Sequence, residues 1–306
     1  MTDVLLKVAS FIAIILLGMF ANRTGILGQR PANTVSKIVF TFTLPAAIVH
    51  AFGSADFTPQ LLWLVPLGVV CTMGPWLITL AATRRTEREE RVFYLLNIAG
   101  FNIGCFALPF VQAFFPATAV VATCMFDAGN ALMMTGGNFS LTQVIASGER
   151  HEHPIVDIVK GLVKSVPFDA YLVLVALALL GIHIPAQVVA FTEPIANANA
   201  FLSLFMVGLM VNFSVNASKV KELLHLIGGR LVLAACMSAV AFLFLPMALE
   251  IRVVVAMLLW APIGSMGPVF TLWAGGDHGL AGLANTITIA IGVVAITAIV
   301  LSGAVG

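Results

Sequence analysis

Residues 92–114 read VFYLLNIAGFNIGCFALPFVQAF, an apolar stretch long enough to cross a membrane but interrupted near its middle. Pro109 removes a backbone donor and clashes with the preceding turn, nearby glycines loosen the helix further, and Asn102 precedes this break. The second half of the chain has a stretch with the same order of features, Pro262-Ile263-Gly264 and then Pro268-Val269-Phe270. Paired Gly/Pro-broken segments in corresponding positions of two halves are the best sequence indication of a ligand site inside a membrane.

The composition is that of an integral membrane protein. Of the 306 residues, 60% are hydrophobic and only 9% are charged, and the mean hydropathy is +1.05. Soluble domains carry about 45–50% apolar and about 25% charged residues. A net charge of +1 gives no sign of a nucleic-acid partner. With roughly 20 apolar residues per span, the pattern predicts an all-α protein whose ten transmembrane helices lie at 3–22, 34–52, 60–82, 92–114, 117–146, 161–182, 193–213, 229–248, 252–273 and 281–304.

The basic residues alternate between the loops as ten spans would require. With the first helix entering from outside, the odd-numbered loops are cytoplasmic and hold all of the 15 Lys and Arg residues except Lys7 and Arg252. Cytoplasmic loops carry an excess of basic residues, and a wrong helix count would scramble the alternation. The pattern therefore predicts a multi-pass protein of the cell membrane with both termini outside the cytoplasm.

Five helices per half would place the two halves in the membrane in opposite senses. Asp127 follows Pro109 by the same interval as Thr286 follows Pro268. This shared order of features predicts a five-plus-five inverted repeat. The predicted units are, in order, a first repeat at 1–147, a cytoplasmic linker at 148–160 and a second repeat at 161–306.

Polar residues inside the apolar stretches are the candidates for substrate and ion contacts. Asn102 can both donate and accept a hydrogen bond beside the first break; the alternative is a contact between helices. Asp127 is the one acid well inside an apolar stretch, and Asn130 shares its helix face. We interpret Asp127 as a proton carrier, against the alternative of a hydrogen-bonded structural residue. Asn285 and Thr286 are further candidates, although such residues commonly join helices in membranes.

Several classes of function are disfavoured by what the sequence lacks. It contains no phosphate-binding loop for ATP and no G-x-S-x-G motif, so we expect neither an enzyme nor a cofactor. His151-Glu152-His153 lacks the H-E-x-x-H spacing of a metal site. No Lys or Arg lies near the middle of a predicted helix. The charge of a bound anion would therefore be met mostly by helix ends and backbone amides.

The interrupted stretch resembles a segment of a known family. Gly100 to Pro109, GFNIGCFALP, is similar to the G-x-N-x-G-x-x-G-x-P segment of the auxin efflux carrier family, with Ala107 where the pattern has glycine. Ala261-Pro262 and the stretch up to Gly276-Asp277 are similar as well. The resemblance implies broken, crossing helices 4 and 9, as in the bile-acid transporter and sodium/proton antiporter folds. It also implies a homodimer, a scaffold of helices 1, 2, 6 and 7, and a transport unit of helices 3–5 and 8–10 that moves as an elevator.

The resemblance further implies a secondary transporter that works by alternating access. Asp127-Ala128-Gly129-Asn130 resembles a segment of bacterial members, which are associated with malate, malonate and similar carboxylates. We therefore expect small organic anions, mono- or dicarboxylates or auxin-like acids, with a proton or sodium ion coupled to them. The alternatives are a sodium-coupled carrier of bile-acid type, a sodium/proton exchanger, and a membrane receptor with a vestigial site. The predicted substrate contacts are Asn102, Gly104, Pro109, Pro262, Gly264 and Pro268, and the predicted coupling residues are Asp127, Asn130, Asn285 and Thr286.

Overall fold

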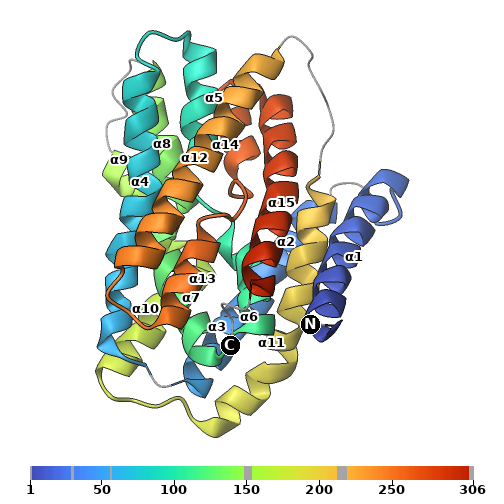
Figure 1. Cartoon of the computed structure of the whole chain (residues 1–306), viewed down its shortest axis with the longest axis vertical. Helices are drawn as coiled ribbons and strands as arrows, with labels where there is room; N and C mark the ends of the chain where they lie inside the picture. The colour runs from blue at the N-terminus through green and yellow to red at the C-terminus, as the bar shows by residue number, and fades with distance from the viewer. Residues whose placement is uncertain (1, 29–30, 56, 148–153, 212–218, 303–306) are drawn as a thin grey trace.

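The computed structural model describes residues 2–28, 31–55, 57–147, 154–211 and 219–302, and this part of the chain is all-helical (Figure 1). Within these described ranges, seven helices are long and apolar enough to cross a membrane, and up to eight spans result if the bent pair Arg88–Ile98 and Ile103–Phe114 counts as one. The predicted fold class, an all-α membrane protein, is confirmed at this level. The histidines at 151 and 153 and the first part of the predicted linker lie outside the described residues.

The first half of the chain follows the predicted spans closely. Its elements are α1 (Thr2–Thr24), α2 (Pro31–Ile38), a π-helical turn (Val39–Thr43), α3 (Leu44–Ser54), a 3-10 turn (Pro59–Trp63), α4 (Leu64–Ala82), α5 (Arg88–Ile98), a second π-helical turn (Ile103–Ala107), α6 (Leu108–Phe114), α7 (Ala117–Leu132), a third π-helical turn (Met133–Gly137) and α8 (Asn138–Ser147). The first two π-helical turns precede Leu-Pro pairs, at Leu44-Pro45 and Leu108-Pro109. A proline has no N–H and its ring clashes with the preceding turn, so a locally wider turn accommodates it within a continuous span.

The second half differs more from the predicted boundaries. Its elements are α9 (Pro154–Val163), α10 (Val166–Leu179), α11 (Ala186–Leu209), α12 (Val220–Phe244), α13 (Leu249–Leu258), α14 (Gly267–Trp273) and α15 (His278–Leu301). Helix α9 begins inside the segment predicted as linker, and α10 is a shorter apolar helix. Helix α12 begins at Val220, whereas the sequence predicts a loop up to residue 229. Lys221, Glu222 and His225 make the first turns of α12 polar, so hydropathy alone does not reveal that they are helical.

The early start of α12 corrects one prediction about charge. Arg230 was predicted to begin a helix at its cytoplasmic end. It lies instead near the middle of α12 and is only 8% exposed. The prediction that no basic residue lies near the middle of a helix is therefore wrong for Arg230.

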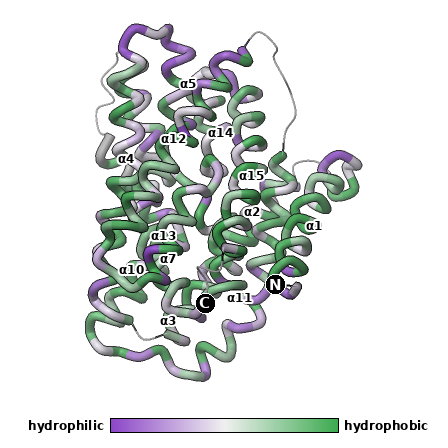
Figure 2. Tube along the Cα trace, viewed as in Figure 1, coloured by the Kyte–Doolittle hydropathy of each residue, from purple (hydrophilic) through white to green (hydrophobic). Residues whose placement is uncertain are grey.

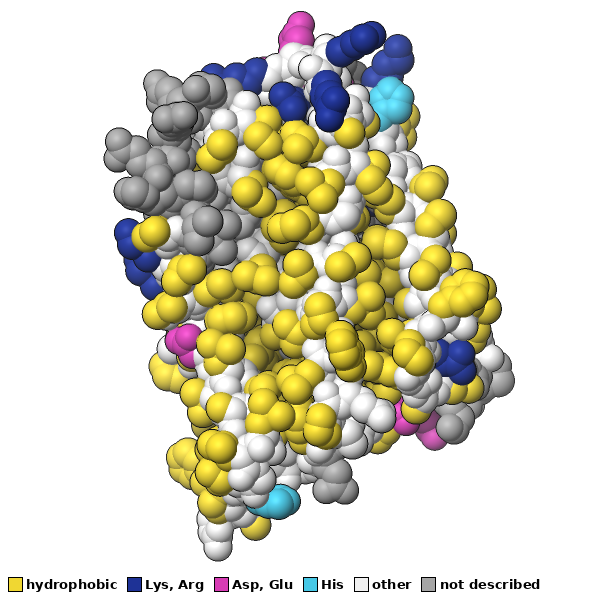
Figure 3. Space-filling model, turned by 90° about the vertical axis from the view of Figure 1, so that its left-hand side faces the viewer, with side chains coloured by type: hydrophobic (Ala, Val, Ile, Leu, Met, Phe, Trp, Pro, Cys, Tyr) yellow, Lys and Arg dark blue, Asp and Glu magenta, His cyan; other side chains and the backbone are white. Residues whose placement is uncertain are grey.

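The surface has an apolar belt between two polar ends, as a bilayer requires. Figure 2 shows hydrophilic residues gathered at the top and bottom of the molecule. Figure 3 shows hydrophobic side chains over the middle of the face that it draws, and large apolar side chains such as Leu6, Phe191 and Phe244 are exposed. Most of the Lys and Arg side chains visible in Figure 3 gather at one end, and both termini lie toward the other end in Figure 1.

An ion-pair cluster ties three helices together near the basic end. Lys219, just before α12, pairs with Glu89 in the first turn of α5, and lies 3.6 Å from the carboxylate of Asp277 before α15. The hydrogen bond to Glu89 raises the pKa of Lys219.

Glycines let two pairs of helices pack with their backbones in contact. A Cβ at Gly68 on α4 would overlap the carbonyl oxygen of Phe126 on α7, and one at Gly129 on α7 would overlap that of Val65. Likewise, a Cβ at Gly18 on α1 would overlap a backbone carbonyl oxygen of α11, and one at Gly208 on α11 would overlap a backbone carbonyl oxygen of α1. Small residues at such interfaces are typical of membrane helices, because van der Waals packing drives their association.

This packing predicts a sharp difference between two equivalent substitutions on α4. Gly68→Ala would force α4 away from α7, and overpacking of this kind costs about 1–3 kcal/mol. Gly74→Ala places its methyl group where no atom lies within 4 Å. We expect the first variant to lower the thermal unfolding midpoint of the purified protein and the second to leave it unchanged. Equal midpoints for the two variants would contradict the close approach of α4 and α7.

Candidate functional site at the crossing of two broken helices

The first break lies between α5 and the π-helical turn that precedes α6. Helix α5 ends at Ile98, and Ala99 is extended. Gly100 has φ +84, a left-handed conformation that favours glycine. The two segments of the span are bent by 46°. Pro109 does not make this break, because it is the second residue of α6 and follows the π-helical turn.

The second break lies between α13 and α14. Helix α13 ends at Leu258 and α14 begins at Gly267, so Pro262 lies within the connecting segment. Pro268 is the second residue of α14. Of the two prolines in this stretch, Pro262 therefore marks the break, and Pro268 starts the helix that follows.

The two breaks contact each other directly, and we call this contact the crossing. The backbone N–H of Asn102 donates a hydrogen bond of 2.9 Å to the carbonyl oxygen of Pro262. The N–H of Ile263 donates to the hydroxyl of Thr288 on α15 at 3.2 Å. Asn102 thus uses its backbone to join the breaks, and in the described part of the chain its side-chain amide has no hydrogen-bond partner.

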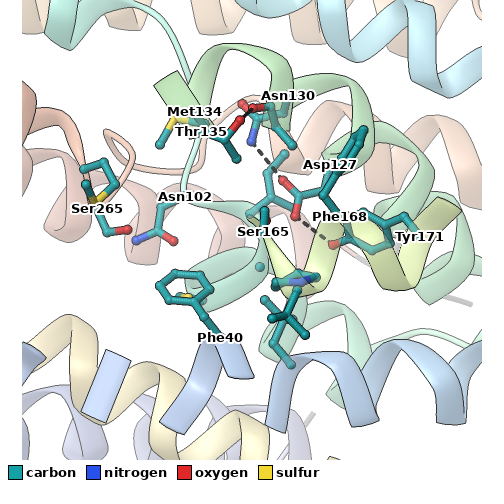
Figure 4. A pocket seen from close by; sticks show the side chains of 18 of the residues that line it. Phe40, Asn102, Asp127, Asn130, Met134, Thr135, Ser165, Phe168, Tyr171 and Ser265 are labelled. Atoms are coloured by element: carbon teal, nitrogen blue, oxygen red, sulfur yellow. Dashed lines mark hydrogen bonds between the residues drawn. The ribbon is translucent and has the colours of Figure 1, made fainter. Parts of the chain in front are cut away.

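A cavity of about 340 Å³ lies beside this crossing (Figure 4). A ligand of small-molecule size occupies pockets of about 300–1,000 Å³. Helices distant in the sequence contribute to its wall. Its polar and aromatic lining includes Phe40, Asn102, Asp127, Asn130, Lys164, Ser165, Phe168, Tyr171 and Ser265.

Asp127, on α7, is held in this cavity by two donors. Its Oδ1 accepts a hydrogen bond of 2.9 Å from the Asn130 amide, and its Oδ2 accepts one of 2.9 Å from the Tyr171 hydroxyl on α10. Tyr171 is 2% exposed, whereas Asp127 is half-buried and reaches the cavity. Gly104 faces the carboxylate from the π-helical turn, and a Cβ there would lie 3.4 Å from Oδ2.

Asn130 also fixes the shape of the first break. Its Oδ1 accepts from the N–H of Phe101 at 3.0 Å, and its Nδ2 donates to the carbonyl of Phe101 at 2.9 Å. These contacts satisfy a backbone unit that the break removes from helical hydrogen bonding. Asn130 therefore links the carboxylate of Asp127 to the backbone of the first break.

Met134 packs against both breaks at once. A Cβ on either Gly100 or Gly264 would overlap its side chain. Gly264 therefore supports the crossing from within and does not line the cavity.

The predicted site residues fall into three groups in the structure. Asn102, Gly104, Asp127 and Asn130 line the cavity. Pro262 and Gly264 form the second break behind it. Pro109, Pro268, Asn285 and Thr286 do not line this cavity.

The four residues outside the cavity have other surroundings. Pro109 lines a second cavity of about 330 Å³, and His50 and Asn197 also line that cavity. Asn285 is buried on α15, and Thr286 donates to the carbonyl of Gly282 on the same helix. Thr288, two residues on, makes the contact with the second break.

Sequence reasoning missed six polar residues of the cavity wall, namely Thr41, Thr135, Lys164, Ser165, Tyr171 and Ser265. Tyr171 had a usable signal, because the chain has only two tyrosines and this one falls inside an apolar stretch. Lys164 lies at the junction of α9 and α10, and the charge pattern of the sequence places it among the basic residues of a cytoplasmic loop. Ser265 carried no signal apart from its place in the second break.

Broken helices that meet beside a cavity in an apolar helical bundle are typical of membrane transport proteins. The chain matches the family described as membrane transport protein over residues 3–299. It belongs to this family, the auxin efflux carrier family, which confirms the resemblance seen in GFNIGCFALP. It is also 26% identical to an uncharacterized transporter of Methanothermobacter thermautotrophicus over 239 residues, which cover 76% of each chain.

Proposed function

We propose that this protein is a secondary transporter of small organic anions, of mono- or dicarboxylate size, and that it moves a proton with its substrate. One observation carries the proposal: the cavity at the crossing presents an unpaired amide, an ammonium group and a carboxyl group to the same space. These belong to Asn102, Lys164 and Asp127. A cavity of about 340 Å³ suits a carboxylate such as malate or malonate.

The proposal includes the finer topology. Ten spans in a five-plus-five inverted repeat would make α5–α6 and α13–α14 the corresponding broken helices. A transport unit built from spans 3–5 and 8–10 would carry the cavity past a scaffold of spans 1, 2, 6 and 7, in each subunit of a homodimer. The basic end would face the cytoplasm of the cell, which places both termini outside.

Charge supports an anion as the substrate. Lys164 is the basic residue among those that line the cavity, and its side chain is exposed. An ammonium group there attracts a carboxylate, and the Asn102 amide can donate a hydrogen bond to it. An anion site would therefore combine one side-chain cation with neutral donors.

Charge also favours coupling to a proton. An ionised Asp127 would repel an anion in the same cavity. The anion therefore binds best when Asp127 carries a proton, so that substrate and proton are bound at the same time. The Tyr171 hydroxyl can act as donor or acceptor, and its contact with Asp127 can persist in both protonation states. This arrangement supports symport of substrate and proton.

The proposal is tested by uptake of radiolabelled malate, malonate, succinate and an indole acid into proteoliposomes. We expect saturable uptake that an inward proton gradient stimulates. Asn102→Ala removes a hydrogen bond to a charged ligand, which contributes about 1.5–3 kcal/mol, so KM should rise about tenfold or more. Asn33→Ala, on the exposed face of α2, is the matched control and should change nothing.

Two outcomes would overturn the proposal. Folded protein that takes up none of these acids would contradict the substrate class and favour a receptor. Uptake that responds to a sodium gradient and not to a proton gradient would favour the sodium-coupled carrier.

A further inference from the structure

We infer that Arg230 makes the crossing selective for anions by neutralising the carbonyl end of α5 from behind the cavity, without touching the substrate. The inference rests on the proposed function. It assigns Arg230 the part of a positioning and selectivity residue. No sequence motif points to it.

The guanidinium of Arg230 binds the end of the first broken helix. Its Nη1 donates to the carbonyl oxygens of Asn97 and Ile98 at 3.0 and 2.8 Å. Both Nη atoms lie within hydrogen-bond distance of the carbonyl of Gly100, at 3.4 and 3.3 Å. The carbonyls of Asn97 and Ile98 are among those that α5 leaves without intrahelical partners, and that of Gly100 belongs to the break.

The same group reaches the second break. Nη2 donates to the carbonyl of Ala261 at 3.3 Å, one residue before the carbonyl of Pro262 that accepts from Asn102. A guanidinium presents several donors in a fixed planar fork, which one ammonium cannot reproduce. Arg230 therefore holds the two breaks together beside the Asn102–Pro262 hydrogen bond.

The charge of Arg230 is not cancelled by an acid. In the described part of the chain, no carboxylate forms an ion pair with it. The C-terminal end of a helix carries about half a negative charge. A full positive charge on that end leaves a net positive potential at the crossing, and the low dielectric of a buried site strengthens it.

Phe101 lies between the guanidinium of Arg230 and the cavity, because it contacts the one and lines the other. The guanidinium lies 5.5 Å from the centre of the Phe101 ring, and Phe101 lines the cavity. The backbone of Phe101 is the unit that Asn130 binds. Without Arg230, the free carbonyl end of α5 would face the crossing and oppose the entry of an anion.

The experiment compares Arg230→Gln and Arg230→Lys in full-length protein, with Arg252→Gln as the control. Like Arg230, Arg252 donates a hydrogen bond to a backbone carbonyl and lies over an aromatic ring, in this case the carbonyl and the ring of Phe242. Arg252 is in the first turn of α13, away from the two breaks. Equilibrium binding of malonate and of its neutral analogue malonamide is measured in detergent, together with the thermal midpoint of each variant. The readout is the ratio of the two affinities, which a purely structural role would not change.

We expect Arg230→Gln to reduce the preference for malonate over malonamide at least tenfold. Arg230→Lys keeps the charge but loses the planar fork, so both affinities should fall together and their ratio should stay within about threefold of the wild type. Arg252→Gln should leave the ratio within the same limits. An unchanged preference in folded Arg230→Gln overturns the inference and leaves the proposed function standing. Should Arg230→Gln fail to fold, Arg230→Lys decides, because a tenfold loss of preference there also overturns the inference. Wild-type protein that binds no carboxylate overturns both.

Discussion

Replacing Asp127 with asparagine is expected to abolish accumulation driven by a proton gradient while leaving exchange of substrate across the membrane intact. Asparagine occupies the same place and can still bond to Asn130 and Tyr171, but it cannot take up or release a proton. Because it is neutral at every pH, it imitates the protonated state in which the cavity accepts an anion. The measurement is uptake into proteoliposomes with and without an imposed pH gradient.

The sign of the pH dependence follows from the same argument. In the wild type, affinity for a carboxylate should fall as the pH rises, because ionised Asp127 repels it. In Asp127→Asn the affinity should stay flat and exceed that of the wild type at high pH. Asp169→Asn removes a half-buried acid on α10 that does not line the cavity, and it should keep the wild-type profile. A wild-type profile in Asp127→Asn would make Asp127 a structural residue.

Local patterns in the sequence were sufficient to identify the two interrupted spans and the acid, although Pro109 lies beyond the first break and not in it. The run of apolar residues around Asn102 and Gly104 marks an interrupted span, and an acid in an apolar stretch such as Asp127 is conspicuous in any sequence. Both features depend on residues close together in the chain, so periodicity and composition detect them.

Contacts between distant residues could not be predicted in this way. Tyr171 donates to Asp127 from 44 residues away, and Arg230 binds Ile98 across 132 residues. Arg230 was also hidden by hydropathy, because the polar first turns of α12 look like a loop. A buried arginine is stabilised here by carbonyls that a broken helix leaves free, and the sequence does not encode that geometry locally.

Reversing the charge of Lys164 is expected to weaken substrate binding more than neutralising it. Lys164 is the basic residue among those that line the cavity, and Coulomb energy is linear in charge. If Lys164→Gln raises KM for malonate about tenfold, Lys164→Glu should raise it about 100-fold. The maximal rate should change less, since Lys164 acts on the approach and binding of the anion.

Lys160→Glu provides the control, because Lys160 is also exposed, lies one turn earlier on α9 and does not line the cavity. Uptake kinetics at low and high ionic strength complete the test. Salt screens exposed charges over about 10 Å at 0.1 M, so the difference between wild type and Lys164→Glu should shrink as salt rises. Equal KM values in Lys164→Glu and Lys160→Glu would mean that net charge at this end of the protein, and not a cation in the cavity wall, attracts the substrate.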